Sequence, residues 1–97
     1  MFRQRFADVI SRQLDVFAED EARGLLAEVS EMKQRYDDAD RDDAEEAYGD
    51  YADVVDAVKD ALADMRDRFA NTLDEHTAET YSTAFEKAAR KRWRWLG

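Results

Sequence analysis

The sequence predicts an all-α fold, in which two long helices and a shorter C-terminal helix form an antiparallel bundle. Apolar residues recur every three or four positions through most of the chain, which is the spacing of one face of an α-helix. The chain has no proline and only three glycines, so the residues that form tight turns between strands are nearly absent. Ninety-seven residues are a common size for one domain, and we expect residues 1–97 to form a single helical domain.

The first predicted helix covers about residues 2–36, because an apolar stripe runs without interruption from Phe2 to Tyr36. A helix of this length measures roughly 50 Å. Gly24 lies inside it and is expected to kink it, since glycine in a helix interior costs about 1 kcal/mol relative to alanine.

An acidic connection is predicted at about residues 37–43, followed by a second helix at about residues 44–71. The connection has almost no apolar side chains to bury. The apolar residues of the second helix alternate in steps of four and three, which is the heptad spacing of a coiled coil. These residues are Ala44, Tyr48, Tyr51, Val55, Val58, Leu62, Met65 and Phe69.

A third helix is predicted at about residues 74–95. Mediocre helix formers cluster after Phe69 and indicate a break, and both Thr72 and Asp74 are candidates to cap the helix that follows. The apolar stripe also continues through this region, so a single helix over about residues 43–95 is the alternative. That alternative is a two-helix hairpin that dimerises, because its wide apolar faces require a second copy or a partner.

The formal net charge is −9, and it is distributed unevenly along the chain. Residues 1–13 carry +2 and residues 87–97 carry +5, so residues 14–86 carry −16. Aspartate outnumbers glutamate, arginine outnumbers lysine and alanine is abundant, a composition that resembles the cytoplasmic proteins of salt-adapted microbes. An acidic surface of that kind serves solubility and identifies no partner.

The residue types that most catalytic and metal sites need are missing. There is no cysteine, which excludes disulfides, thiol nucleophiles and thiolate metal sites, and His76 is the only histidine. The acidic residues between Asp37 and Glu46 do not fit a calcium loop, because Asp43 occupies the position of the required glycine. We therefore expect no enzyme activity, no cofactor and no metal. With no leader or spanning segment recognisable in the sequence, we expect a cytoplasmic protein.

The C-terminal end is the main candidate for partner binding. It interleaves cations with aromatic rings, a combination that suits an anionic groove, nucleic acid or a membrane interface. The residues are Arg90, Lys91, Arg92, Trp93, Arg94 and Trp95. In the alternative interpretation, the cations complement the dipole of a helix C-terminus while Trp93 and Leu96 complete the core. In an up-down-up bundle this end returns toward the acidic connection, which would provide an internal charge partner.

Tyr48 and Tyr51 are the candidates for self-association, because tyrosine supplies rigid amphipathic area suited to interfaces. A ridge of aspartates on the same helix lies roughly opposite the apolar stripe. It would either imitate a phosphate backbone or keep the helix solvated, which is the simpler explanation. The ridge consists of Asp50, Asp53, Asp56, Asp60, Asp64 and Asp67.

The expected function is therefore a non-enzymatic protein-interaction or self-assembly module, with a homodimer as the expected form. The first alternative is a module that contacts nucleic acid or anionic lipid through its basic-aromatic C-terminal helix. The second alternative is an acidic inhibitor that imitates DNA and depends on the aspartate ridge.

Overall fold

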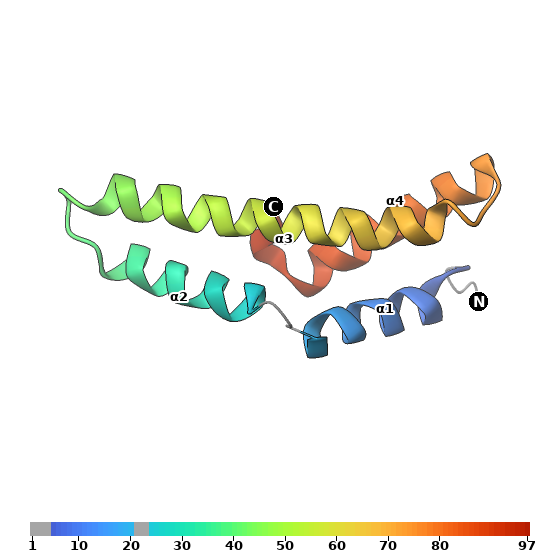
Figure 1. Cartoon of the computed structure of the whole chain (residues 1–97), viewed down its shortest axis with the longest axis horizontal. Helices are drawn as coiled ribbons and strands as arrows, with labels where there is room; N and C mark the ends of the chain where they lie inside the picture. The colour runs from blue at the N-terminus through green and yellow to red at the C-terminus, as the bar shows by residue number, and fades with distance from the viewer. Residues whose placement is uncertain (1–4, 21–23) are drawn as a thin grey trace.

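A computed structural model describes residues 5–20 and 24–97, and this part of the chain forms α-helices packed together with no strand (Figure 1). The predicted all-α class is confirmed. The elements in chain order are α1 (Ala7–Asp20), α2 (Leu25–Asp38), α3 (Ala44–Ala70), α4 (Glu75–Arg92) and a short 3-10 helix, η1 (Arg94–Leu96). α3 runs along most of the length of the molecule, with α2 beside its first half and α1 beside its second half (Figure 1).

The prediction of one continuous helix over about residues 2–36 is wrong, because α1 ends at Asp20 and α2 begins at Leu25. Residues 2–4 and 21–23 of that predicted helix lie outside the described residues. Gly24 has φ 65° and ψ 16°, in the left-handed region that costs other residues about 1–2 kcal/mol. Its carbonyl oxygen accepts a hydrogen bond from the N–H of Glu28 at 2.8 Å, so Gly24 opens the second helix rather than kinking one long helix.

A short acidic turn joins α2 to α3, close to the connection that the sequence predicts. Ala39 is extended, with ψ 141°, and ends α2. Asp40 Oδ1 then accepts a hydrogen bond from the N–H of Asp43 at 3.1 Å, which closes the turn. The two helices therefore lie antiparallel against each other, with the turn at one extreme end of the molecule (Figure 1).

The chain breaks again between α3 and α4, so the alternative of a two-helix hairpin is wrong. Of the two candidate caps, Asp74 is the one used: its Oδ1 accepts from the Thr77 N–H at 2.9 Å and its Oδ2 from the Thr77 hydroxyl at 2.8 Å. These hydrogen bonds lower the pKa of the Asp74 carboxyl. Thr72 instead donates its hydroxyl to the carbonyl of Phe69 at 2.7 Å, at the end of α3.

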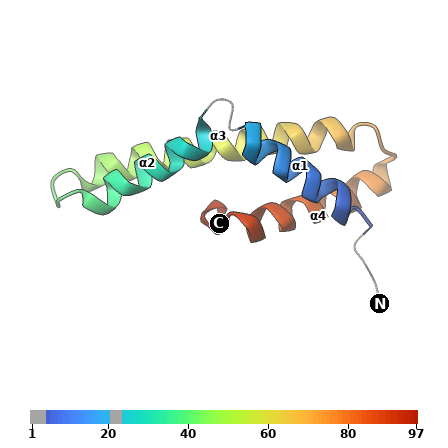
Figure 2. The same cartoon turned by 90° about the horizontal axis from the view of Figure 1, so that it is seen from below.

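α4 is too short to follow α3 back along its whole length. Its 18 residues extend about 27 Å, whereas the 27 residues of α3 extend about 40 Å. The C-terminal residues Leu96 and Gly97 share a groove with Lys59 and Leu62, so the third helix stops near the middle of α3 (Figure 2). Beyond that point α2 and α3 continue as a two-helix layer.

We call residues 25–58 the arm and residues 5–20 with 59–97 the body. The arm consists of α2, the acidic turn and the first half of α3; the body contains α1, the second half of α3, α4 and η1. The molecule measures 50 × 28 × 23 Å, and its radius of gyration is 15.8 Å. A globular chain of this length has a radius of gyration of about 12.5 Å, so the arm makes the protein distinctly elongated.

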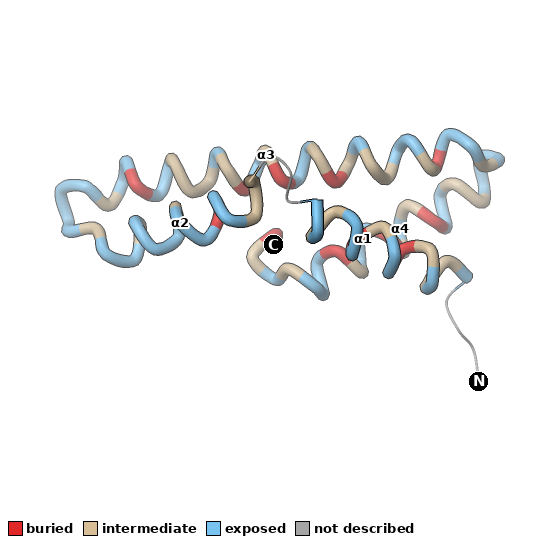
Figure 3. The backbone as a smooth tube through the Cα atoms, turned by 60° about the horizontal axis from the view of Figure 1, so that its bottom comes forward, coloured by how far each residue is buried: buried red, intermediate tan, exposed pale blue. Residues whose placement is uncertain are grey.

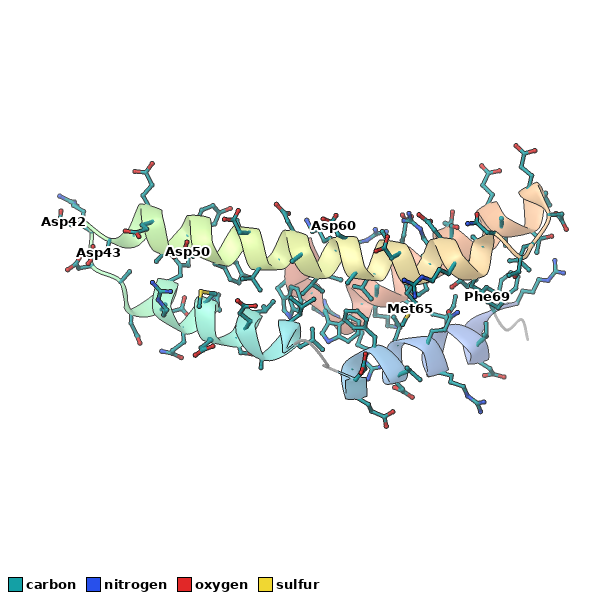
Figure 4. The ribbon with its side chains drawn as sticks, viewed as in Figure 1. Asp42, Asp43, Asp50, Asp60, Met65 and Phe69 are labelled. Atoms are coloured by element: carbon teal, nitrogen blue, oxygen red, sulfur yellow. The ribbon has the colours of Figure 1, made fainter. Side chains whose placement is uncertain are left out.

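Buried residues occur in both the arm and the body, and the largest fully buried side chains, Tyr81 and Phe85, lie in the body (Figure 3). Tyr81 is fully buried, and its hydroxyl donates to Oε1 of Gln13 at 2.8 Å. Burial raises the pKa of the Tyr81 phenol. The rings of Phe6 and Phe69 lie 5.4 and 4.7 Å from that of Tyr81, and Figure 4 shows Phe69 directed from α3 toward α1. Phe6, the residue before α1, therefore holds the start of this helix against α3 and α4.

Replacing Gly24 by alanine distinguishes the broken helix from a continuous one. We expect G24A to lower the free energy of unfolding by about 1 kcal/mol, because alanine is strained in the left-handed region. In a continuous helix the same change would raise it by about 1 kcal/mol. Urea unfolding followed by circular dichroism measures the difference, and a gain in both stability and helix content would contradict the break at Gly24.

Candidate functional site

The predicted partner-binding residues lie on two different elements. Arg90, Lys91 and Arg92 form the exposed last turn of α4. The helix ends at Trp93, whose φ of −123° and ψ of 90° turn the backbone into η1. The η1 turn is closed by the Leu96 N–H donating to the Trp93 carbonyl at 3.0 Å. This geometry folds the C-terminus back onto the body.

The two tryptophans pack against the core. The ring of Trp93 meets the ring of Phe17 of α1 edge-on at 5.7 Å, and both Trp93 and Trp95 are partly buried against the core cluster. Leu96, the residue after them, is only 6% exposed. Both tryptophan side chains therefore pack against the core, and each stays partly exposed.

Arg92 is also engaged within the chain. Its Nη1 donates to Oδ1 of Asp15 on α1 at 2.7 Å, and its guanidinium carbon lies 5.2 Å from the ring centre of Trp93. Both partners of the ion pair are well exposed, so the pair contributes at most about 1 kcal/mol. It nevertheless orients the end of α4 against α1.

The prediction that this end returns to the acidic connection is wrong. The C-terminus lies near the middle of the molecule, whereas the turn between α2 and α3 lies at the far end of the arm (Figure 2). Asp42 and Asp43 mark that far end in Figure 4. The physical reason is that α4 is shorter than α3. Among the described residues, Asp15 is therefore the only acidic residue that forms an ion pair with the cations at the end of α4.

Four cations at this end remain exposed and form no ion pair with the described residues: Lys87, Arg90, Lys91 and Arg94. We call residues 87–94 the basic end. It contains five basic residues and no acidic residue. Uncompensated cations of this density give the basic end a locally positive electrostatic potential.

A groove of about 420 Å³ lies between α1 and α4 and runs beside the basic end. Its apolar residues are Ile10, Leu14 and Ala88, and its cations are Lys87, Lys91 and Arg92. Ser11 adds a hydroxyl on the α1 side. Apolar residues beside a row of cations suit a ligand that has both an apolar group and anionic groups.

The groove on the other side of α4, toward α3, has a mixed charge. It measures about 390 Å³ and includes Lys59, Arg66, Glu86 and Arg90. Arg66 donates to Asp67 at 2.8 Å and to Glu86 at 2.7 Å, and these carboxylates raise the pKa of the guanidinium. This groove is therefore largely neutralised from within, unlike the groove beside α1.

The predicted self-association residues lie in the arm, where they form an aromatic cluster with Tyr36 of α2. The ring of Tyr36 lies 5.4 Å from that of Tyr48 and is stacked 6.4 Å from that of Tyr51. Tyr48 is 53% exposed, and only it and Val16 are large apolar residues exposed by half or more in the described chain. The sequence did not predict that Tyr36 joins this cluster.

Gly49, next to Tyr48, is a helical glycine that the fold of one chain does not require. A Cβ added at Gly49 would meet no atom within 4 Å, and its φ is not positive. Glycine in a helix interior costs about 1 kcal/mol relative to alanine, so nothing within the described chain compensates for that cost. A bare backbone beside an exposed aromatic ring allows close approach by another helix. The signal in the sequence is the Tyr48–Gly49 dipeptide inside a predicted helix.

The net charge of the protein belongs to the arm. Residues 25–58 contain twelve acidic and three basic residues, for a net charge of −9, while the rest of the chain is neutral overall. Two of the three arm cations pair locally, Lys33 with Asp37 at 2.6 Å and Arg35 with Asp50 at 3.7 Å. This distribution gives the protein an acidic half and a half with a basic end.

The described residues contain no cluster of three or more His, Asp or Glu side chains arranged to hold a metal ion. No helix in the described ranges is long and apolar enough to cross a membrane. Five residues of the predicted aspartate ridge are exposed: Asp53, Asp56, Asp60, Asp64 and Asp67. Asp50 is only partly exposed and pairs with Arg35 of α2, and Lys59 and Arg68 interrupt the ridge.

No known protein family, no curated protein and no solved structure matches this sequence.

The structural role of Trp93 is testable by truncation. We expect W93A to lower the free energy of unfolding by about 2–3 kcal/mol, less than for a fully buried aromatic because the ring is only partly buried. R94A, an exposed neighbour, serves as the control and should change stability by less than about 0.5 kcal/mol. Equal, small effects of the two substitutions in urea unfolding would show that the ring does not hold η1 on the body.

Proposed function

We propose that this protein is a non-enzymatic self-assembly module whose functional form is a homodimer, with the arm as the associating element. The observation that carries the proposal is the arm surface around Tyr48 and Gly49. It combines a half-exposed aromatic ring with bare helix backbone in a two-helix layer that has no third helix over it. Tyrosine at such a place is typical of interfaces, because it buries a large rigid area at low entropic cost.

The exposed surface of the whole chain supports association. The chain exposes 7049 Å², whereas a compact monomer of 11.3 kDa exposes about 5,700 Å². The excess is about 1,300 Å², and a standard protein–protein interface covers about 800 Å² on each partner. A dimer interface of standard size would therefore fit within the excess exposed surface of each chain.

A second candidate function is binding of nucleic acid or anionic lipid by the basic end. The four cations without an ion pair support it. The packing of Trp93 and Trp95 against the core argues against base stacking, which would leave only phosphate contacts. Such binding would weaken steeply with salt, and R90A/R94A would reduce the slope by about two phosphate contacts.

The role of the arm is tested most sharply by Gly49→Ala, because the change acts in opposite directions on the monomer and the dimer. In the monomer, G49A should raise the free energy of unfolding by up to about 1 kcal/mol, since alanine favours the helix and meets nothing. In the dimer, the added methyl group should obstruct the close approach of the partner and weaken association at least about tenfold. Y48A should weaken association by a similar factor through loss of the aromatic contact.

Sedimentation equilibrium over a wide range of protein concentration measures both effects on association. V16A is the matched control, because Val16 is 51% exposed but lies on α1, outside the arm. It should leave the dissociation constant unchanged. A wild-type protein that stays monomeric at millimolar concentration in both low and high potassium chloride would refute the proposal.

A further inference from the structure

We infer that the arm of one chain docks on the basic end of a second copy, and that the two copies do so reciprocally. This inference rests on the proposed self-association and specifies which surface receives the arm. The occupant of the basic groove between α1 and α4 is thus the acidic, tyrosine-bearing face of the partner's α3.

Electrostatics disfavour the simplest alternative, in which two arms pair with each other. Each arm carries a net charge of −9, so direct arm–arm contact brings eighteen excess negative charges together. Two unit charges 10 Å apart in water repel by about 0.4 kcal/mol before salt screening, and such an interface would contain many of these pairs. Docking an arm on the basic end replaces this repulsion with attraction to five cations.

The docking face of the arm matches the basic groove in chemistry. On α3, Glu45 lies one turn before Tyr48 and Asp53 lies one turn after Gly49, and all four are exposed. The face is therefore apolar and small at its centre, with a carboxylate on each side. The groove is apolar along Ile10 and Leu14 and cationic along α4. The partner's Tyr48 ring would then lie on these apolar residues, and its carboxylates would face the lysines of α4.

The docking face of the arm lies on the side of α3 that α4 covers in the body. Counting back from Ala63 and Arg66, which line the groove between α3 and α4, two steps of seven residues lead to Gly49 and Ala52. Residues seven apart share a helix face, so the docking face of the arm points to the side that α4 occupies in the body. Figure 2 shows that no helix continues the line of α4 along the arm.

Reciprocal docking closes the assembly at two copies. The arm extends to one end of an elongated chain and the basic end lies near its middle, so a two-fold axis across the long dimension can bring each arm to the other copy's basic end. Both arms and both basic ends are then occupied, so no unoccupied binding surface remains to add further copies and form a filament.

Charge reversal tests the inference directly. The basic-end variant K87E/K91E and the arm variant E45K/D53K should each raise the dimer dissociation constant at least about tenfold, measured by sedimentation equilibrium. An equimolar mixture of the two variants should restore association, because the reversed arm then meets a reversed basic end. R12E/R68E is the matched control: it makes the same charge change as K87E/K91E at exposed positions that line neither groove, and should leave association within about twofold of wild type.

The salt dependence of the wild type adds a second readout. Raising potassium chloride from 0.1 M to 1 M, where the screening length falls to about 3 Å, should weaken the dimer if arms dock on basic ends. Arm–arm pairing should strengthen instead, because screening relieves its repulsion.

Three outcomes would overturn the inference. If K87E/K91E associates like wild type while Y48A does not, the arms pair with each other, and the proposed function stands while the inference falls. If K87E/K91E keeps its self-association but loses affinity for duplex DNA, the basic end serves nucleic acid. A wild type that never associates removes the proposed function together with the inference.

Discussion

The shape of this protein depends on the length difference between α3 and α4, because α2 and the first half of α3 extend beyond the point where α4 ends. Apolar faces of helices must be covered, and in the body α1, the second half of α3, α4 and η1 cover one another around Tyr81 and Phe85. α4 stops near the middle of α3, so the arm is left as two helices without a third. Val29 is the only residue of α2 that is buried, and Ala47, Val55 and Val58 are the buried residues of the arm half of α3. The arm is therefore an extension of the body in which the contact between two helices provides the burial.

Gly24 separates two halves of one apolar stripe so that they can use different partners. The stripe on α1 packs against α4, where Phe17 meets Trp93, while the stripe on α2 packs against α3. One straight helix could lie along only one of these lines. The same division segregates charge, because the acidic turn and its flanking helices form the arm and the cations gather where α4 ends. The arrangement of the helices and the distribution of charge therefore both depend on the break at Gly24 and on the end of α4.

Periodicity and capping residues predict the long helix α3 and two of the three chain breaks, but not the break at Gly24. The heptad pattern located α3 closely, and the candidate cap Asp74 identified the start of α4. The break at Gly24 was missed because the stripe stays in phase across it, so spacing alone cannot show that the packing partner changes. The place where the C-terminus returns was missed because it depends on relative helix lengths. At the candidate site, the sequence identified Tyr48 and the cations, but only the structure shows that Trp93 is engaged in packing and that Gly49 has open space beside it.

Hydrogen exchange at several protein concentrations tests directly the proposal that a second chain covers the arm. In dilute solution, the amides of Ala47 and Val55 in the arm should exchange faster than those of Tyr81 and Phe85 in the body, since the arm is a two-helix layer with no third helix over it. This difference should narrow as the concentration rises and the dimer forms. Arm amides that are as protected as body amides at the lowest concentration, with no dependence on concentration, would contradict it.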